Sequence, residues 1–479
     1  MKRDSVSKNY IFSMAYQILT LITPLITTPY VSRVLNASLI GDYNFTNSIN
    51  QYFILFAALG VALYAQREIA YAGDDRKRRS IIFWEIQVFK TVTFSISGCL
   101  YWIVLCNSGE NVLLYKVQLI YIIAALLDIS WLFQGLELFK ITVLRNIIVK
   151  VISIISIFLF VKSDRDLVLY VLILCGSQLI SNLTIWAYVP RFIEKVQIKS
   201  IHPLRHLKPT LALFIPQLAS QVYLVFDKTV LGILSTNEEV GYYTQAEKIV
   251  KMSVTVLTAL GTVLMPRIAA EFEGGDTFKI REGFEKAIRI SMAIGIPMCI
   301  GIIGVAKSFV PWFLGPGYDS AADVMIVLAP LAIFMGISGI TGPAFLIPMK
   351  LQKEYTISVL AGAGMNLVLN FLFIPIWGAV GASIGTIVSE GTVMIIQALA
   401  VLKRVDGVSI VKIVLHYALL SIPMAAYLVV INSFQIMNGA LIIPLCVIAI
   451  FIYAATLFCA KDKIVKMISN KFRHTDERQ

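Results

Sequence analysis

The segment QLASQVYLVFDKTVLGILSTNEEVGYYTQAEKIVKMSVTVLTALGT, residues 217–262, predicts two long apolar helices joined by a short polar turn at residues 235–239. Polar residues of the first helix share one face, because they lie four and seven residues apart: Gln217, Gln221 and Lys228. The second helix carries one polar stripe at alternating spacings of four and three: Thr244, Lys248, Lys251, Thr255, Thr258 and Thr262. Two lysines therefore lie within an otherwise apolar helix.

This stripe requires a polar environment. If the turn marks a membrane surface, a rise of about 1.5 Å per residue places Lys251 near the middle of a bilayer. A charge there costs roughly 2.5–3.5 kcal/mol. We interpret Lys248 and Lys251 as lining a cavity for an anionic ligand. The alternative is an ion pair of either lysine with Asp128 or Glu390.

The composition is that of a polytopic α-helical membrane protein. The chain has 479 residues, of which 58% are hydrophobic and only 15% are charged, and its mean hydropathy is +0.78. A soluble chain keeps about a quarter of its residues charged. In a membrane protein, a net charge of +12 indicates an excess of Lys and Arg in the cytoplasmic loops. We therefore expect no nucleic-acid partner.

About fourteen apolar segments are each long enough to span a bilayer. With the N-terminus in the cytoplasm, the cytoplasmic stretches hold 32 of the 41 Lys and Arg residues, external stretches five and helix interiors four. The four interior residues are Lys90, Lys228, Lys248 and Lys251. This asymmetry predicts that both termini and the loop at residues 76–79 are cytoplasmic.

A sequence repeat predicts two related halves. Residues 33–35 and 41–49 resemble residues 228–231 and 241–249: a basic residue, Val-Leu, a short turn and a helix start of the type G-x-Y-x-x-T/A. Such repeats are typical of transporters that bind substrate between two lobes. We therefore expect an N-terminal six-helix lobe at 1–200, a second at 201–404, and two peripheral helices with a basic cytoplasmic tail at 405–479.

Motifs for catalysis or metal binding are not apparent. The sequence contains no Gly-Lys pair, which excludes a Walker phosphate loop, and the six cysteines lack paired spacing. His202 and His206 have helical spacing, but Pro203 lies between them, so we expect a solvated basic loop. We expect neither enzymatic activity nor a cofactor or metal.

Several stretches together resemble a known family. They are 27–53 (TTPYVSRVLNASLIGDYNFTNSINQYF), 55–70, 131–146 (WLFQGLELFKITVLRN), 225–251, 313–330 (FLGPGYDSAADVMIVLAP) and 348–390. In this order they are similar to the polysaccharide-transport branch of the multidrug/oligosaccharidyl-lipid/polysaccharide exporter superfamily, the Wzx-type flippases.

The resemblance implies two pseudo-symmetric six-helix lobes plus two C-terminal helices, as in multidrug exporters of this superfamily (MATE-like). It implies translocation of an undecaprenyl-pyrophosphate-linked oligosaccharide across the bacterial cytoplasmic membrane by alternating access, for capsule, O-antigen, exopolysaccharide or teichoic-acid synthesis. The family's cationic central cavity corresponds best to Lys248 and Lys251, with Lys90, Lys228 and Arg33 as weaker candidates. Further candidates for substrate contact are Gln217, Gln221, Thr244 and Thr255. Asp128, Glu390 and Asp227 are candidates for counter-charges or for coupling to a proton or sodium ion, whose identity stays open.

Other functions fit less well. A lipid II flippase is the nearest alternative, since its fold and helix count are similar. A multidrug cation antiporter should carry acids on the stripe, and a membrane glycosyltransferase should carry a large external loop. We expect the substrate and the bilayer as partners, pathway enzymes as possible further partners, and a monomer.

Overall fold

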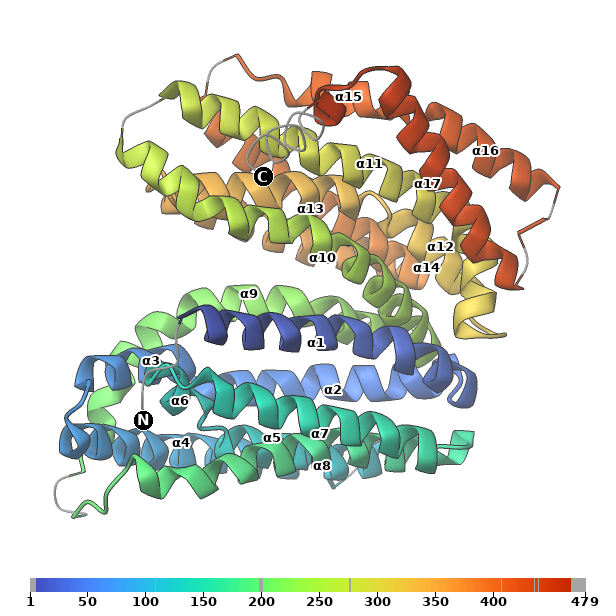
Figure 1. Cartoon of the computed structure of the whole chain (residues 1–479). Helices are drawn as coiled ribbons and strands as arrows, with labels where there is room; N and C mark the ends of the chain where they lie inside the picture. The colour runs from blue at the N-terminus through green and yellow to red at the C-terminus, as the bar shows by residue number, and fades with distance from the viewer. Residues whose placement is uncertain are drawn as a thin grey trace. The chain divides into compact units, whose positions relative to one another are not determined.

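The computed structural model describes residues 6–107, 109–197, 201–274, 277–405, 407–434, 436–437 and 439–466. Within these ranges, ten helical segments are long and apolar enough to cross a membrane. A bent pair, Ile410–Leu420 and Ile422–Ser433 at 45°, makes an eleventh. The protein is thus an all-helical, multi-pass membrane protein, as the composition predicts (Figure 1).

The number of fourteen spans is not confirmed, although a helix covers each predicted segment. Two predicted spans, 355–375 and 378–402, correspond to the two helices of α14 (Gln352–Leu402), which separate at Gly378, where φ is 52°. The two helices pack against each other, since Gln397 Nε2 donates to the Ser358 hydroxyl at 3.0 Å, but together they make only one of the ten segments. The first and seventh predicted spans form α1 (Val6–Val34) and α9 (Leu207–Leu234), which are not among the ten. The count therefore depends on how bent and partly polar helices are divided.

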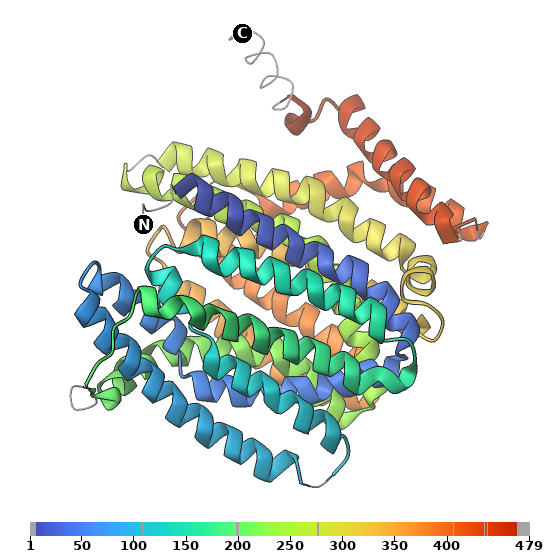
Figure 2. The same ribbon diagram turned by 60° about the horizontal axis from the view of Figure 1, so that its bottom comes forward.

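The chain folds as two compact units, Met1–Gly241 and Tyr242–Gln479. Besides α1 and α9, unit 1 contains α2 (Ala37–Ala58), α3 (Val61–Ala72), α4 (Arg76–Leu105), α5 (Val112–Leu127), α6 (Ser130–Gly135), α7 (Phe139–Phe160), α8 (Leu167–Thr184) and the 3₁₀ turns η1 (Asp164–Asp166), η2 (Ile185–Arg191) and η4 (Pro203–His206). Helix α8 packs on α5 and α7, and α7 packs on α1, so these helices run side by side (Figure 2). One buried core joins α3, α4 and α6 around Phe83 and Trp131.

The sequence repeat appears in the structure as two equivalent joints. Helix α1 ends at Val34 and α2 begins at Ala37, while α9 ends at Leu234 and α10 (Asn237–Glu273) begins at Asn237. Each joint is a two-residue turn. A short turn between antiparallel apolar helices is what the polar residues at both positions predict.

Unit 2 contains most of α10 together with α11 (Thr277–Leu314), α12 (Asp319–Leu328), α13 (Leu331–Ile340), the π-helical turn η5 (Thr341–Leu346), α14, α15 (Ile410–Leu420), α16 (Ile422–Ser433), η6 (Gly439–Leu441) and α17 (Ile442–Cys459). A large apolar core joins α11, α13, η5, α14 and α15 around Phe284 and Phe345. Small residues allow close approach: a Cβ on Gly261 would lie 1.9 Å from the carbonyl oxygen of Gly339.

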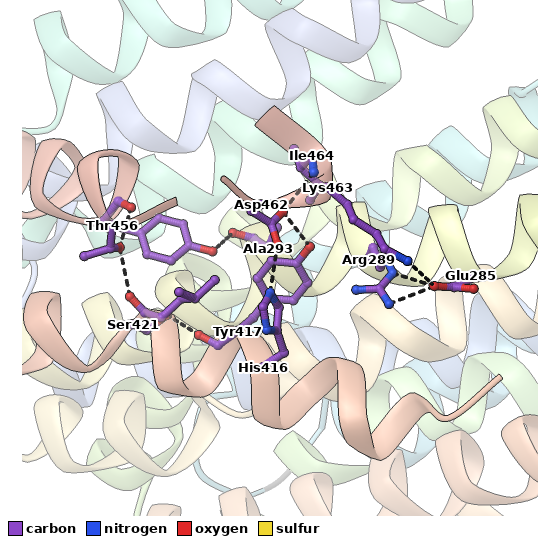
Figure 3. Close-up of polar contacts among 12 residues, drawn as sticks. Glu285, Arg289, Ala293, His416, Tyr417, Ser421, Thr456, Asp462, Lys463 and Ile464 are labelled. Carbon is purple, nitrogen blue, oxygen red and sulfur yellow. Dashed lines mark hydrogen bonds and ion pairs between the residues drawn. The ribbon is translucent and has the colours of Figure 1, made fainter. Parts of the chain in front are cut away.

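Polar contacts attach the C-terminal helices to α11 (Figure 3). Asp462, after α17, accepts hydrogen bonds from His416 Nε2 at 2.8 Å and from the Tyr417 hydroxyl at 3.2 Å, both on α15. Tyr453 of α17 donates to the Ala293 carbonyl of α11 at 2.8 Å. These bonds fix α15 and α17 on unit 2.

The division at residues 200 and 404 stays a prediction. The compact units divide later, after Gly241, because α9 packs on α2 and α3. The basic tail lies outside the described residues from 467 onward.

Candidate functional site

The polar stripe on α10 contains an acid that the prediction overlooked. Lys251 Nζ lies 2.6 Å from Glu247 Oε1, one helical turn earlier, and forms an ion pair with it. The Glu247 side chain is 6% exposed, whereas that of Lys251 remains 36% exposed. Lys251 therefore has a counter-charge on its own helix, which differs from the predicted alternatives Asp128 and Glu390. Its ammonium group can still reach a ligand.

The other members of the stripe make local contacts. Lys248 Nζ donates to Gln245 Oε1 at 3.4 Å, and the Thr255 hydroxyl donates to the Lys251 carbonyl at 2.8 Å. Thr244 is buried, and its hydroxyl has no hydrogen-bond partner among the described residues. The described contacts therefore keep both lysines on one helix face, close to each other.

The side chain of Lys90 is buried and does not line an open cavity among those described. It is 5% exposed on α4, and its Nζ donates to the carbonyls of Ala125 at 3.1 Å and Asp128 at 2.7 Å. A cation beside the last carbonyls of a helix interacts favourably with the negative end of the helix dipole. Lys90 thus stabilises the end of α5. Asp128 itself accepts a hydrogen bond from the Ser130 amide at 2.9 Å.

The remaining candidates are dispersed over both units. Arg33 lies exposed in the last turn of α1, Gln221 is exposed on α9, Asp227 is buried there, and Lys228 is half-buried. Glu390 is half-buried on α14. The side chain of Gln217 lies outside the described residues.

Unit 1 contains a polar cavity of about 640 Å³ that none of the lysine candidates lines. We call it the unit 1 cavity. Helix α7 lines it with Thr142, Arg145, Asn146, Lys150 and Ser153. Helix α8 lines it with Tyr170, Ser177, Gln178, Ser181 and Asn182. The other polar lining residues are Gln17, Thr23, Thr27, Tyr43, Tyr121, Asp128, Ser130 and Gln134. Of the predicted site residues, only Asp128 is among them.

The cations of this cavity were missed because the charge count assigned them to the cytoplasm. Lys150 is the central residue of the membrane-spanning segment Lys140–Phe160, so it lies roughly 15 Å along the helix from either end. The polar residues Thr142, Asn146 and Ser153, which line the cavity, lie four and seven residues apart from one another in the order 142–146–153, so they share one helix face. This is the same signal that placed Gln217, Gln221 and Lys228 on one face.

The residues before α9 are folded against unit 1. His206 is 2% exposed, its Nε2 lies 3.1 Å from Glu85 Oε2, and its Nδ1 lies 2.8 Å from the Tyr64 hydroxyl. Arg205 also pairs with Glu85. The prediction of a solvated loop is therefore wrong for His206, because a buried carboxylate on α4 binds it. Burial lowers the pKa of His206, and Glu85 opposes this shift.

In the described part of the chain, no three His, Cys, Asp or Glu side chains are placed to hold a metal ion.

Comparison with known proteins places this geometry in a family. A family model described as "Polysaccharide biosynthesis protein" matches residues 6–271. The chain is 25% identical over 404 residues to a putative O-antigen transporter of Escherichia coli (strain K12), covering 81% of this chain and 94% of that protein. It is 25% identical over 179 residues to the probable low-salt glycan biosynthesis flippase Agl15 of Haloferax volcanii, covering 37% of each protein.

Solved structures show the same fold. The lipid II flippase MurJ in an inward closed conformation matches with a TM-score of 0.75 at 16% identity, covering 93% of this chain and 98% of that chain. An inward-facing multidrug resistance MATE family transporter of the MOP superfamily matches with a TM-score of 0.57 at 13% identity, covering 81% and 100% of the two chains. The MATE-like fold is therefore confirmed.

Proposed function

Since the chain belongs to the polysaccharide biosynthesis protein family, we propose that it is a flippase for an undecaprenyl-pyrophosphate-linked oligosaccharide. The curated relatives named as an O-antigen transporter and a glycan flippase support this function. The observation that carries it is the α10 stripe, where Lys251 stays 36% exposed beside Lys248 within a membrane-spanning segment.

We assign the pyrophosphate to Lys248 and Lys251. Lysine binds phosphate as a point charge and does not require one fixed geometry. A group that must bind on one side of a membrane and leave on the other benefits from this tolerance. Glu247 holds Lys251 in the absence of substrate and leaves the stripe with one net positive charge, so it moderates the affinity for an anion.

Transport by alternating access requires a source of energy. A pyrophosphate with a charge of about −2 that leaves a cell with a negative interior gains roughly 4–5 kcal/mol per 100 mV. The membrane potential alone therefore suffices in this scheme. If Asp128 or Glu390 instead carries an obligatory proton or sodium ion, its neutralisation to Asn or Gln stops transport.

The cellular setting follows from this proposal. We propose that the protein is a monomer in the bacterial cytoplasmic membrane. We further propose that both of its termini lie in the cytoplasm, because the distribution of Lys and Arg favours this orientation. The chemistry is translocation, and no bond of the substrate is formed or broken.

The test is a flipping assay in proteoliposomes with fluorescent undecaprenyl-pyrophosphate oligosaccharide. We expect the protein to move this lipid, and Lys248→Gln/Lys251→Gln to slow it at least tenfold. Lys412→Gln, which removes an exposed cation from α15, is the matched control and should leave the rate unchanged. Full transport by the double variant would refute the assignment of the stripe. Transport of lipid II in preference to the oligosaccharide lipid would refute the substrate.

A further inference from the structure

The unit 1 cavity has the composition of a site for a charged, hydroxyl-rich ligand. Its volume of about 640 Å³ lies within the range of about 300–1,000 Å³ that is usual for small-molecule sites. Hydroxyl and amide groups dominate its polar lining, which suits the many donors and acceptors of a sugar ring. All its lining residues belong to unit 1, so the cavity is complete within that unit.

The charge of the cavity favours an anion. Arg145 and Lys150 line it, and Asp128 is the one acid among its described lining residues. One oxygen of Asp128 already accepts the Ser130 amide. A lysine at the centre of a membrane-spanning helix is costly unless it faces water, a counter-charge or a ligand. The two cations and one acid of the described lining together carry a net positive charge, which favours a negative ligand.

Arg145 is held in a defined orientation. Its Nε and Nη2 donate to Asn146 Oδ1 at 3.2 and 2.7 Å, and the Ser181 hydroxyl donates to the same oxygen at 3.1 Å. This contact links α7 to α8 at the wall of the cavity. A guanidinium fixed in this way is preorganised for the planar geometry of a carboxylate, for which arginine is better suited than lysine.

Neutral groups beside the cations can recognise the rest of a sugar. Gln134 and Gln178 line the cavity, and their amides have no hydrogen-bond partner within the described part of the chain. Polar groups at membrane depth need such a partner, water or a ligand. Tyr43 and Tyr170 lie edge to face with ring centroids 5.7 Å apart. Aromatic rings of this kind offer apolar faces to the C–H groups of a sugar.

We propose that the unit 1 cavity binds an acidic sugar residue of the transported oligosaccharide, with Arg145 and Lys150 contacting its carboxylate. This inference rests on the proposed function and adds a preference among substrates. The α10 stripe binds the pyrophosphate that every lipid-linked substrate shares. The unit 1 cavity then distinguishes oligosaccharides that carry a uronic acid from neutral ones.

The first experiment measures binding by the full-length protein in nanodiscs with saturation-transfer NMR. The probes are D-glucuronate, D-glucose and inorganic phosphate. We expect glucuronate to bind at least tenfold more tightly than glucose, and Lys150→Gln and Arg145→Gln each to weaken glucuronate at least tenfold. Lys140→Gln, on the same helix but outside the cavity lining, should bind like the wild type. Equal affinity for glucose and glucuronate, or phosphate binding as tightly as glucuronate, would overturn the acidic-sugar assignment.

The second experiment separates this inference from the proposed function. Flipping of an acidic and a neutral oligosaccharide lipid is compared in proteoliposomes. We expect Lys150→Gln to slow the acidic substrate at least fivefold more than the neutral one, and Lys150→Arg to keep the preference. A wild-type protein that flips both substrates while Lys150→Gln affects them equally refutes the inference alone. Failure of the wild type to flip either substrate refutes the proposed function, and the binding data then decide the cavity independently.

Discussion

Replacement of Lys251 by alanine tests whether its contact with Glu247 is structural, functional or both. An exposed pair one turn apart contributes about 0.3–0.5 kcal/mol, whereas breaking a fully buried pair costs roughly 3–5 kcal/mol. The pair lies between these limits, because Glu247 is 6% and Lys251 36% exposed. For Lys251→Ala we expect a destabilisation of about 1–3 kcal/mol, which lies between the limits for exposed and fully buried pairs.

The double variant Glu247→Gln/Lys251→Ala provides the matched control. It removes the carboxylate together with its partner, so we expect it to recover stability to within about 1 kcal/mol of the wild type. The difference between the double variant and the sum of the two single variants gives the coupling energy of the pair. The measurement is reversible unfolding of the purified protein by SDS titration in mixed micelles, beside the flipping assay.

Transport by the double variant distinguishes the two functions of Lys251. If Lys251 binds pyrophosphate, the double variant is stable and its flipping rate is at least tenfold reduced. A stable double variant with the wild-type rate would show that Lys251 only neutralises Glu247. Additive stabilities of the single variants would refute the energetic reasoning, since the pair would then contribute nothing.

Three further outcomes are expected. On an otherwise cysteine-free chain, an impermeant thiol reagent should label Asn237→Cys in intact cells and Lys77→Cys only after permeabilisation; the reverse would overturn the orientation. Burial raises the pKa of Asp462, but hydrogen bonds from the Ile464 amide, His416 and Tyr417 outweigh burial and lower the pKa below its ordinary value. The ionised carboxylate therefore stabilises the fold at any pH above the ordinary pKa, and this stabilisation is lost as the pH falls through the lower pKa of the folded state. We therefore expect Asp462→Asn to cost about 1–3 kcal/mol at pH 7, measured by SDS unfolding, with faster hydrogen exchange in α15; unchanged exchange would contradict the attachment shown in Figure 3. Burial lowers the pKa of His206 below its usual value near 6.5. The unfolded chain therefore binds a proton at a higher pH than the folded chain, and the free energy of unfolding should fall as the pH drops below about 6.5. His206→Gln should flatten this dependence of the unfolding free energy on pH between about pH 5 and 8, and an unchanged slope would exclude His206 as its source.

The fold could be predicted from the sequence because its main signal is repeated many times along the chain. Apolar segments of membrane length, separated by polar turns, specify helices wherever they occur. The break of α14 at Gly378 agrees with the predicted spans 355–375 and 378–402, whereas the total number of spans is not confirmed. The exact ends of a helix depend on backbone geometry that many different sequences adopt. A small change in where a helix is said to end can therefore merge two spans or divide one.

The contacts that the candidate site residues make could be predicted from the sequence only in part. The polar stripe of α10 is visible in the sequence because two lysines share a face, but the spacing analysis overlooked Glu247, one turn before Lys251, as the counter-charge of Lys251. Lys90 was identified as an intramembrane charge, yet its contacts are the carbonyls of Ala125 and Asp128, and a pairing with main-chain atoms leaves no pattern in the sequence. Lys150 was counted as cytoplasmic, although the spacing of its polar neighbours on α7 contained the required signal.

The two repeats meet within unit 1, and this contact explains their shared glycine. Gly41 and Gly241 are each the fifth residue of their helix, α2 and α10. A Cβ on Gly41 would lie 1.5 Å from the carbonyl oxygen of Asn237, and one on Gly241 would lie 2.0 Å from that of Ala37. Each glycine therefore packs against the first residue of the other helix, in a reciprocal arrangement. The same sequence feature that predicts two related halves also allows their helix starts to touch, so conformational freedom does not explain these glycines, whereas close backbone approach does.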